Sequence, residues 1–276
     1  MGYSPLIQRM FITLEWRQML RSKWLLLVAL LFAVVFVAIV MIQQMALPDV
    51  EGFTRQTASF LNLLLFLLPL FALTIGSMSI AGDMESGWFS LLKTYPLTLT
   101  QYIIGKFVAL CGAFFFILVF AFSIVLLLGG VLGGVRLPFA FLALALCLVL
   151  ICASLSIFIG SLAKNRLYAL AISLVVWALL LLLLSYLLMA IGTVVAGHVL
   201  QKLTIVMMHL NPVEWLRFAY FLLADQATVL GPTYFDVIRF YESPLGIVVF
   251  TVVTLAWIIV PLVASVYILR KNGVRK

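Results

Sequence analysis

The chain has 276 residues, of which 66% are hydrophobic and only 9% are charged, and its formal net charge is +8. A soluble globular domain carries about 25% charged residues, so this composition excludes a soluble fold and indicates an integral membrane protein. The lysines and arginines form no basic stripe with interleaved aromatic side chains, and the sequence therefore gives no support for nucleic-acid binding.

The first predicted element is a helix over residues 6–23, LIQRMFITLEWRQMLRSK. Apolar side chains recur at helical spacing and share one face. We therefore predict an amphipathic helix at the inner membrane interface, before the first span. The alternative is a plain basic flank that only sets the topology. The predicted apolar face consists of Leu6, Ile7, Met10, Phe11 and Leu14, and the side chains off that face are Arg9, Glu15, Arg17 and Gln18.

Six later segments are long enough and apolar enough to cross a bilayer, which takes about 20 residues. They do not show the alternation that is typical of strands. The predicted fold class is an all-α membrane protein with six transmembrane helices in a single domain over residues 1–276. The predicted spans are Trp24–Gln43, Phe60–Ile80, Gly105–Leu128, Phe139–Leu162, Leu167–Ile191 and Gly246–Leu269.

The distribution of lysine and arginine predicts that both chain ends lie in the cytoplasm. Cytoplasmic loops hold the excess of these residues. If the N-terminus is inside, twelve fall on the inner side and five on the outer side, which predicts a multi-pass protein of the inner (cytoplasmic) membrane. The inner set is Arg9, Arg17, Arg21, Lys23, Lys93, Lys106, Lys164, Arg166, Arg270, Lys271, Arg275 and Lys276, and the outer set is Arg55, Arg136, Lys202, Arg217 and Arg239.

A polar interruption, DMESGWFSLLKTYPLT, follows the second span over residues 83–98 and is predicted to face the cytoplasm. Gly87 permits a sharp entry into a short helix. Tyr95 and Pro96 end that helix, because proline disfavours the helical conformation in the residue before it. Thr98 or Thr100 can cap the helix that follows.

This short helix presents Trp88, Leu91 and Leu92 on one face, which is available to a soluble partner. The alternative is a polar reversal between two spans, in which Glu85 and Lys93 are simply solvated. The local sequence does not decide between the two interpretations.

The segment of residues 192–243 is predicted to lie outside the membrane, and it is too long for a simple loop. It looks helical on both sides of Asn211-Pro212. Asparagine is a good N-cap, and proline suits the first turn of a helix. We therefore predict a helix from Pro212 to about Ala227, with Glu214 in its first turn.

A small cluster of soft ligands precedes this helix, with His198, Met207, Met208 and His209 on the predicted outer face. Thioether and imidazole groups suit copper. The alternative is that the two methionines pack on the membrane face and the histidines lie at its polar edge. We therefore assign no metal site and keep Met207, Met208 and His209 as candidates only.

The sequence contains none of the motifs that we associate with catalysis or nucleotide binding, including GxxxxGK[ST], the dinucleotide fingerprint, HExxH and GxSxG. We expect no catalytic residue, no bound cofactor and no enzyme activity in this chain alone. The predicted spans are almost free of ionisable side chains, and Lys106 at an inner end is expected to extend its ammonium to the interface. We therefore predict that another protein supplies the energy for the activity of this chain.

The whole pattern resembles the permease subunits of type-2 ABC exporters. After the second span, that family has an acidic residue, Glu, a spacer and Gly, a Leu pair, a Pro and a Gly-Lys. This sequence departs at Ser86-Gly87-Trp88, where a Gly-Thr pair is usual. The matching positions are Asp83, Glu85, Gly87, Leu91, Leu92, Pro96, Gly105 and Lys106.

The resemblance implies a homodimer or heterodimer of permeases, with each copy on a separate ATPase subunit that binds ATP and magnesium. It implies that residues 83–98 and the N-terminal helix receive the motion of the ATPase. The outer helices around Asn211–Ala227 would form the external gate or contact a periplasmic partner. The implied coupling residues are Asp83, Glu85, Gly87, Trp88, Leu91, Leu92 and Pro96, and the implied gate residues are Asn211, Pro212, Glu214 and Arg217.

Within that family, the segment LNPVEWLRFAYFLL is similar to the NosY-type permeases of nitrous-oxide-reductase maturation. That likeness implies movement or delivery of copper or sulfur species outside the inner membrane. Other members export lipids, glycans, peptides or drugs. Two alternatives remain at this point, namely a mechanotransmitting anchor that acts on an external partner without conducting a substrate, and a stand-alone channel or secondary transporter.

Overall fold

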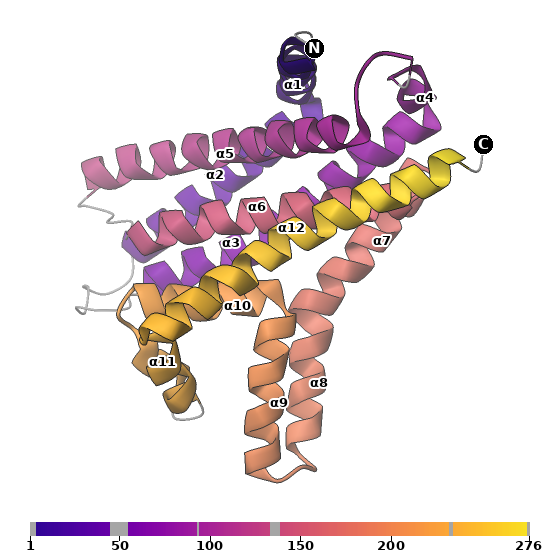
Figure 1. Cartoon of the computed structure of the whole chain (residues 1–276). Helices are drawn as coiled ribbons and strands as arrows, with labels where there is room; N and C mark the ends of the chain where they lie inside the picture. The colour runs from indigo at the N-terminus through magenta and orange to yellow at the C-terminus, as the bar shows by residue number, and fades with distance from the viewer. Residues whose placement is uncertain (1–3, 45–54, 93, 133–138, 232–233, 275–276) are drawn as a thin grey trace.

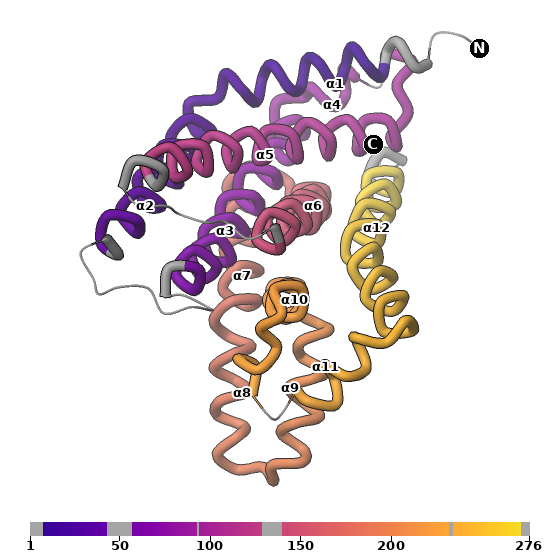
Figure 2. Tube along the Cα trace, turned by 90° about the vertical axis from the view of Figure 1, so that its left-hand side faces the viewer, coloured from indigo at the N-terminus to yellow at the C-terminus, as the bar shows by residue number. Residues whose placement is uncertain are grey.

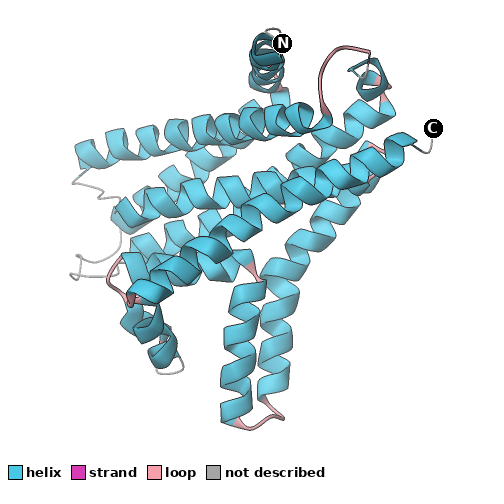
Figure 3. Ribbon diagram, in the orientation of Figure 1, coloured by secondary structure: helices cyan, strands magenta, loops and turns pink. Residues whose placement is uncertain are grey.

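The computed structural model describes residues 4–44, 55–92, 94–132, 139–231 and 234–274. Every regular element in these ranges is helical, as Figure 3 shows. Lys93, Arg136, Arg275 and Lys276 lie outside the described residues, and so do the side chains of Leu6 and Ile7. The elements are α1 Ser4–Leu20, α2 Lys23–Gln44, α3 Arg55–Glu85, α4 Trp88–Leu92, α5 Leu99–Leu132, α6 Phe139–Leu162, α7 Arg166–Ala178, η1 Leu179–Leu183, α8 Leu184–Gly192, α9 Gly197–Leu210, α10 Pro212–Leu223, η2 Ala227–Leu230, α11 Phe235–Tyr241 and α12 Pro244–Val274.

Six helical segments of the described chain are long and apolar enough to span a membrane, which confirms the predicted fold class. The second and third of these helices continue beyond the predicted apolar runs at their polar ends. Apolar length locates a span, but a helix continues until its backbone meets a breaking or capping residue. The six segments are Lys23–Ile42, Thr57–Glu85, Leu99–Leu128, Ala140–Leu162, Arg166–Gly192 and Pro244–Lys271.

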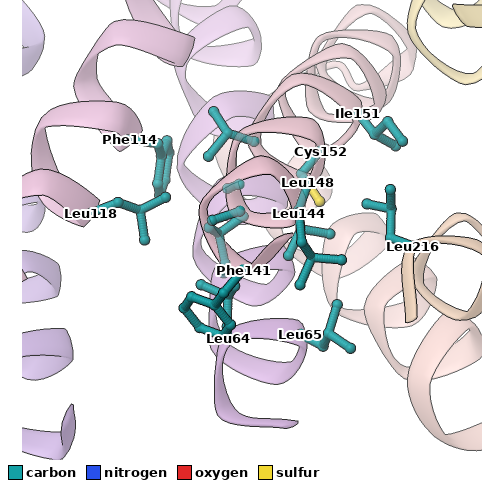
Figure 4. Packing of buried hydrophobic residues seen from close by; sticks show 14 of the residues in the cluster. Leu64, Leu65, Phe114, Leu118, Phe141, Leu144, Leu148, Ile151, Cys152 and Leu216 are labelled. Atoms are coloured by element: carbon teal, nitrogen blue, oxygen red, sulfur yellow. The ribbon is translucent and has the colours of Figure 1, made fainter. Parts of the chain in front are cut away.

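The centre of the bundle is the pair α3 and α6, which makes the most extensive helix contact in the chain. Small residues allow the close approach that apolar helices need in lipid. A Cβ atom built on Gly76 would lie 2.1 Å from Oγ of Ser156, and one on Gly160 would lie 2.7 Å from the carbonyl oxygen of Ser77. The main core is filled largely by leucine and phenylalanine side chains from several helices, including Leu64, Phe141 and Leu148 (Figure 4).

Two spans contain a proline, and a side chain from a neighbouring helix satisfies a nearby carbonyl in each. Proline has no N–H and disturbs the preceding turn. In α3, the carbonyl of Phe66, three residues before Pro69, accepts a hydrogen bond from Nε1 of Trp177 at 3.1 Å. In α12, the carbonyl of Ile258, three residues before Pro261, accepts from Oγ of Ser154.

The fifth span leaves the bundle at its far end. Helices α7, η1 and α8 follow one another, and α8 and α9 form a pair that projects away from the other helices (Figures 1 and 2). No residue of α8 is buried. The chain then returns, and α10 lies against the bundle with eight of its residues buried, among them Trp215.

The sequence predicted that this helix ends near Ala227, but α10 ends earlier, at Leu223. Asp225 has a φ of 56°, in the left-handed region that breaks a helix, and the short helix η2 follows it. The predicted start is confirmed, because Asn211 is the N-cap of α10 and its side chain accepts from the N–H of Val213. Proline at the first position has no N–H to leave unpaired there.

Candidate functional site

A buried ionic cluster joins three helices at the end of the bundle that carries α1 and α4. Nζ of Lys106, on α5, lies 2.7 Å from Oε2 of Glu15 on α1 and 2.8 Å from Oδ2 of Asp83 on α3. The Lys106 residue is 3% exposed and Glu15 is 1% exposed. Removing one partner of such a buried ion pair strongly destabilises the fold, because the charge that is left behind is buried without an opposite charge. We name Glu15, Asp83 and Lys106 the ionic cluster.

Two polar groups complete the hydrogen bonds of the ionic cluster. The hydroxyl of Tyr102 donates to Oδ2 of Asp83 at 2.7 Å, and Lys106 donates to Oγ of Ser79 at 3.3 Å. Oε1 of Glu15 is buried and has no hydrogen-bond partner among the described residues. The cluster thus sets two carboxyl groups against one ammonium.

The environment of Glu15 favours the protonated carboxyl. Burial raises the pKa of Glu15, the ammonium of Lys106 opposes that rise, and the carboxylate of Asp83 adds to it. Desolvation and a like charge both disfavour the ionised form. A proton on Glu15 would leave the cluster with no net charge.

Two expectations from the sequence are wrong here. Lys106 does not extend its ammonium to the interface, and Glu15 does not lie on the exposed side of the first helix. Of the predicted apolar face, Phe11 is buried within the chain, whereas Met10 and Leu14 are exposed, as side chains that face a membrane interface would be. The reason is tertiary, since a carboxylate on α1 can be buried only where Lys106 of α5 meets it.

Glycines in α5 allow α1 to lie close against it. A Cβ on Gly105 would lie 2.5 Å from a ring carbon of Phe11, and one on Gly112 would lie 1.8 Å from a ring carbon of Trp16. In Figure 2, α1 runs alongside α5 at the top of the molecule. The two aromatic rings therefore seat α1 on α5 on either side of the Glu15–Lys106 pair.

The α3–α4 corner adjoins the ionic cluster. Gly87 has a φ of 76°, which L residues rarely adopt, and it allows the turn between α3 and α4. Phe89 of α4 is buried and lies edge-on to the Tyr102 ring, with centroids 5.3 Å apart. After the corner, Thr98 and Gln101 form a capping box at the start of α5, as the sequence allowed.

The residues implied as coupling residues separate into an inner and an outer group. Asp83 is buried in the ionic cluster, and Leu92 packs on the apolar cluster that contains Phe89. Trp88 is half-buried. The exposed members are Glu85, Gly87, Leu91 and Pro96, and the neighbouring Tyr95 is exposed as well.

Glu85 is exposed but is not simply solvated. Its Oε2 accepts a hydrogen bond from the backbone N–H of Arg166 at 3.0 Å, where α7 begins. A carboxylate at a helix N-terminus satisfies a free N–H and interacts favourably with the helix dipole. The side chain of Arg166 in turn covers Gly82, on which a Cβ would lie 2.4 Å from Nε. The α3–α4 corner is thus attached to the start of the fifth span.

The residues implied for the external gate lie at or near the corner between α9 and α10. Asn211 and Pro212 are buried within this chain. Glu214 and Arg217 are partly exposed and form an ion pair of 2.9 Å. The structure therefore brings all four residues into the first turns of α10 and leaves only the charged pair near the surface.

The soft-ligand candidates have other contacts. Met208 is packed in the main apolar core. Nδ1 of His209 lies 2.7 Å from the carbonyl oxygen of Ile205, and its Nε2 lies 2.6 Å from the hydroxyl of Tyr241, so both ring nitrogens are engaged. Met207 is half-buried and His198 is exposed. Among the described residues, no group of three or more His, Cys, Asp or Glu side chains is placed to hold a metal ion.

Sequence reasoning missed two members of this site, Glu15 and Tyr102. An acidic residue in an otherwise basic helix, next to Trp16, was the available signal for Glu15. Tyr102 lies one turn before Lys106 and therefore shares its helix face. Neither signal names the partner, which lies on another helix.

Comparison with known proteins gives matches over most of the chain. A family model described as ABC-2 family transporter protein matches residues 10–274. A protein of Pseudomonas aeruginosa described as a probable ABC transporter permease protein NosY is 33% identical over 208 residues, which are 72% of this chain and 75% of that protein. A protein of Stutzerimonas stutzeri with the same description is 44% identical over 92 residues, 32% of this chain and 33% of that protein.

Proposed function

Because this chain belongs to the ABC-2 family of transporter proteins and is a membrane permease subunit of an ABC transporter, we propose that it couples ATP hydrolysis in a separate ATPase subunit to export or delivery of a substrate. ATP and magnesium would be held by that ATPase. The permease would lie in the inner membrane with both termini in the cytoplasm. A second copy of this chain would complete the complex as a homodimer.

One observation carries the proposed coupling role, namely that the α3–α4 corner combines an exposed apolar edge with a firmly held base. Leu91 is 48% exposed and Tyr95 is 59% exposed, whereas Phe89 in the same corner is buried. The base is attached to α1 and α5 through the ionic cluster and to α7 through Glu85. A force applied by a soluble partner at the edge would therefore reach several helices at once.

The test is the substitution Leu91→Lys in the permease expressed with its ATPase. We expect the ATPase to co-purify in smaller amount or to lose its stimulation, while the thermal unfolding of the permease stays unchanged. Leu245→Lys is the matched control, since Leu245 is an exposed leucine at the start of α12. Equal complex formation and equal ATP turnover in Leu91→Lys would show that the coupling assignment is wrong.

A second candidate is a mechanotransmitting anchor that moves an external partner without conducting a substrate. The burial of α10 against the bundle favours this anchor, because apolar side chains fill the space between that helix and the bundle. Reconstitution with the ATPase in sealed vesicles separates the candidates. ATP hydrolysis without movement of any substrate favours the anchor, and a stand-alone channel or secondary transporter would work without the ATPase.

As cargo we propose copper or sulfur species for nitrous oxide reductase, which is what the resemblance of LNPVEWLRFAYFLL to NosY-type permeases implies. Deletion of this permease should then lower the copper content of that reductase in the same cell. The triple replacement of Met207, Met208 and His209 asks whether these side chains handle the metal. Because His209 and Met208 have structural contacts, loss of copper delivery counts only if the variant still assembles with its ATPase.

A further inference from the structure

The fifth span contains an irregular turn whose cause does not lie in the local sequence. Residues Leu179–Leu183 form a π-helical turn, and the N–H of Leu184 bonds to the carbonyl of Leu179, five residues back. The sequence around it is WALLLLLLS, without proline or glycine. Such turns are frequently found at functional sites. The interaction that stabilises this turn therefore comes from elsewhere in the fold.

Asn211 makes a contact with this turn from the corner between α9 and α10. Its Nδ2 donates to the carbonyl oxygen of Leu180 at 2.6 Å, and its Oδ1 accepts from the N–H of Val213 at 3.0 Å. Its own N–H bonds to the carbonyl of Met207, and its carbonyl accepts from the N–H of Trp215. Asn211 is 1% exposed. One side chain thus caps α10 and also holds that helix to the fifth span.

The π-helical turn lies at the boundary between two halves of the fifth span that have different neighbours. Before it, the span is attached to α3, because Ser173 bonds to Ser77 at 2.7 Å and Trp177 donates to the carbonyl of Phe66. After it, α8 has no buried residue and runs beside α9, away from the bundle (Figure 1). A π-helical turn at such a boundary is a suitable hinge, and Asn211 is attached to it.

The α9–α10 corner also has contacts with the sixth span that do not involve the Asn211 side chain. Nε1 of Trp215 donates to Oγ1 of Thr254 at 3.0 Å, and Nε1 of Trp257 donates to the carbonyl of His209 at 3.3 Å. Because neither bond involves the Asn211 side chain, we expect both to remain when Asn211 is changed. Loss of the Asn211 side chain should therefore separate the corner from the fifth span without unfolding the corner.

We propose that Asn211 is a positioning residue that joins α10 to the hinge of the fifth span, so that motion entering at the α3–α4 corner moves the external helices. This inference rests on the proposed function and adds to it the residue that transmits motion to the external side. The start of the fifth span is held at that corner by Glu85 and Arg166. Its hinge is held to α10 by Asn211.

The test compares Asn211→Ser with Asn165→Ser in the complete complex with its ATPase. Both asparagines are N-caps, and serine caps a helix about as well as asparagine. Only Asn211 donates from its side chain to another helix among the described contacts of the two. Comparing the two variants therefore distinguishes loss of the hydrogen bond to Leu180 from the mere replacement of an asparagine N-cap.

The measurement is the distance between spin labels at Val194, on the tip of the α8–α9 pair, and Leu127 on α5, in a cysteine-free background. Both positions are exposed. We expect the wild-type and Asn165→Ser distances to differ between the nucleotide-free and vanadate-trapped states, and Asn211→Ser to lose most of that difference while ATP is still hydrolysed. Should Asn211→Ser fail to assemble, Asn211→Gly replaces it, because glycine is tolerated at N-caps.

A wild-type shift that persists in full in a folded Asn211 variant would overturn the inference and leave the proposed function standing. Absence of any nucleotide-dependent shift in the wild-type complex would overturn the proposed coupling itself, and the role of Asn211 with it. The two failures are thus distinguishable within one experiment.

Discussion

Nζ of Lys106 lies 2.7 Å from Oε2 of Glu15, although three helices separate α1 from α5 along the chain. Both side chains are almost fully buried. This pair attaches α1, which is not one of the membrane-spanning helices, to the third membrane span. Through Asp83, the same ammonium also holds α3, so that the ends of α1, α3 and α5 are joined next to the α3–α4 corner.

Removal of Lys106 should be strongly destabilising. In Lys106→Met the two carboxyl groups lose the ammonium that pairs with both of them, and we expect the free energy of unfolding to fall by about 3–5 kcal/mol. Unfolding by sodium dodecyl sulfate in mixed micelles measures it. Lys164→Met, at an exposed lysine, is the control. Equal stability of the two variants would contradict a structural role for the ion pairs.

The stability of the folded chain should depend on pH through Glu15. Its pKa in the folded state is raised above the ordinary value of 4.5. The folded state therefore binds this proton more tightly than the unfolded state, so the stabilisation is complete below 4.5 and is lost as the pH rises through the folded pKa.

Unfolding curves measured from pH 4 upward test this dependence, with about pH 4 as the start because the carboxyl is then mostly protonated in both states. In Glu15→Gln this part of the pH dependence should disappear. Glu242→Gln, at an exposed glutamate, should keep it. A Glu15→Gln curve parallel to the wild-type curve would show that Glu15 does not carry the proton.

Gly112→Ala should displace α1 from α5, because the added Cβ would lie 1.8 Å from a ring carbon of Trp16. Overpacking of this kind costs about 1–3 kcal/mol. Gly197→Ala is the matched control, since beyond the neighbouring backbone of its own helix no heavy atom lies within 4 Å of a Cβ built there. If Trp16→Leu restores the unfolding free energy in the Gly112→Ala background, the clash with the Trp16 ring is the cause. If Gly112→Ala leaves the unfolding free energy unchanged, the Trp16 ring does not pack against Gly112 as described.

Trp177→Phe keeps an aromatic ring beside Phe66 but removes the donor to the carbonyl near Pro69. One such hydrogen bond contributes about 0.5–1.5 kcal/mol to stability. We expect a loss of that size in the unfolding free energy. Trp24→Phe, at an exposed tryptophan, should have a smaller effect. Equal effects would mean that the indole N–H contributes nothing at Phe66.

Much of the fold was predictable because it depends on local pattern. The length of each apolar run locates a span. Asn211 before Pro212 is a start signal that acts through neighbouring backbone groups, and it is confirmed. Of the two candidate caps Thr98 and Thr100, Thr98 is the one that bonds to the first turn of α5. These features need no information from distant parts of the chain.

The ionic cluster and the π-helical turn depend on contacts between distant residues and were not predictable from pattern. Glu15 looks like a surface residue until Lys106 is placed beside it. The run of leucines around Leu180 has no feature that distinguishes a π-helical turn from an α-helical one, and the partner Asn211 comes much later in the sequence. In both cases, tertiary structure overrode the local expectation.

The seating of α1 on α5 also has a consequence for how the protein is made. The ribosome adds about 5–20 residues per second, so Lys106 is synthesised several seconds after Glu15. During that interval the first helix has neither the ammonium of Lys106 nor the glycines that receive Phe11 and Trp16. The N-terminal helix can therefore reach its final place only after the start of the third span has been made, so the first element docks well after its own synthesis.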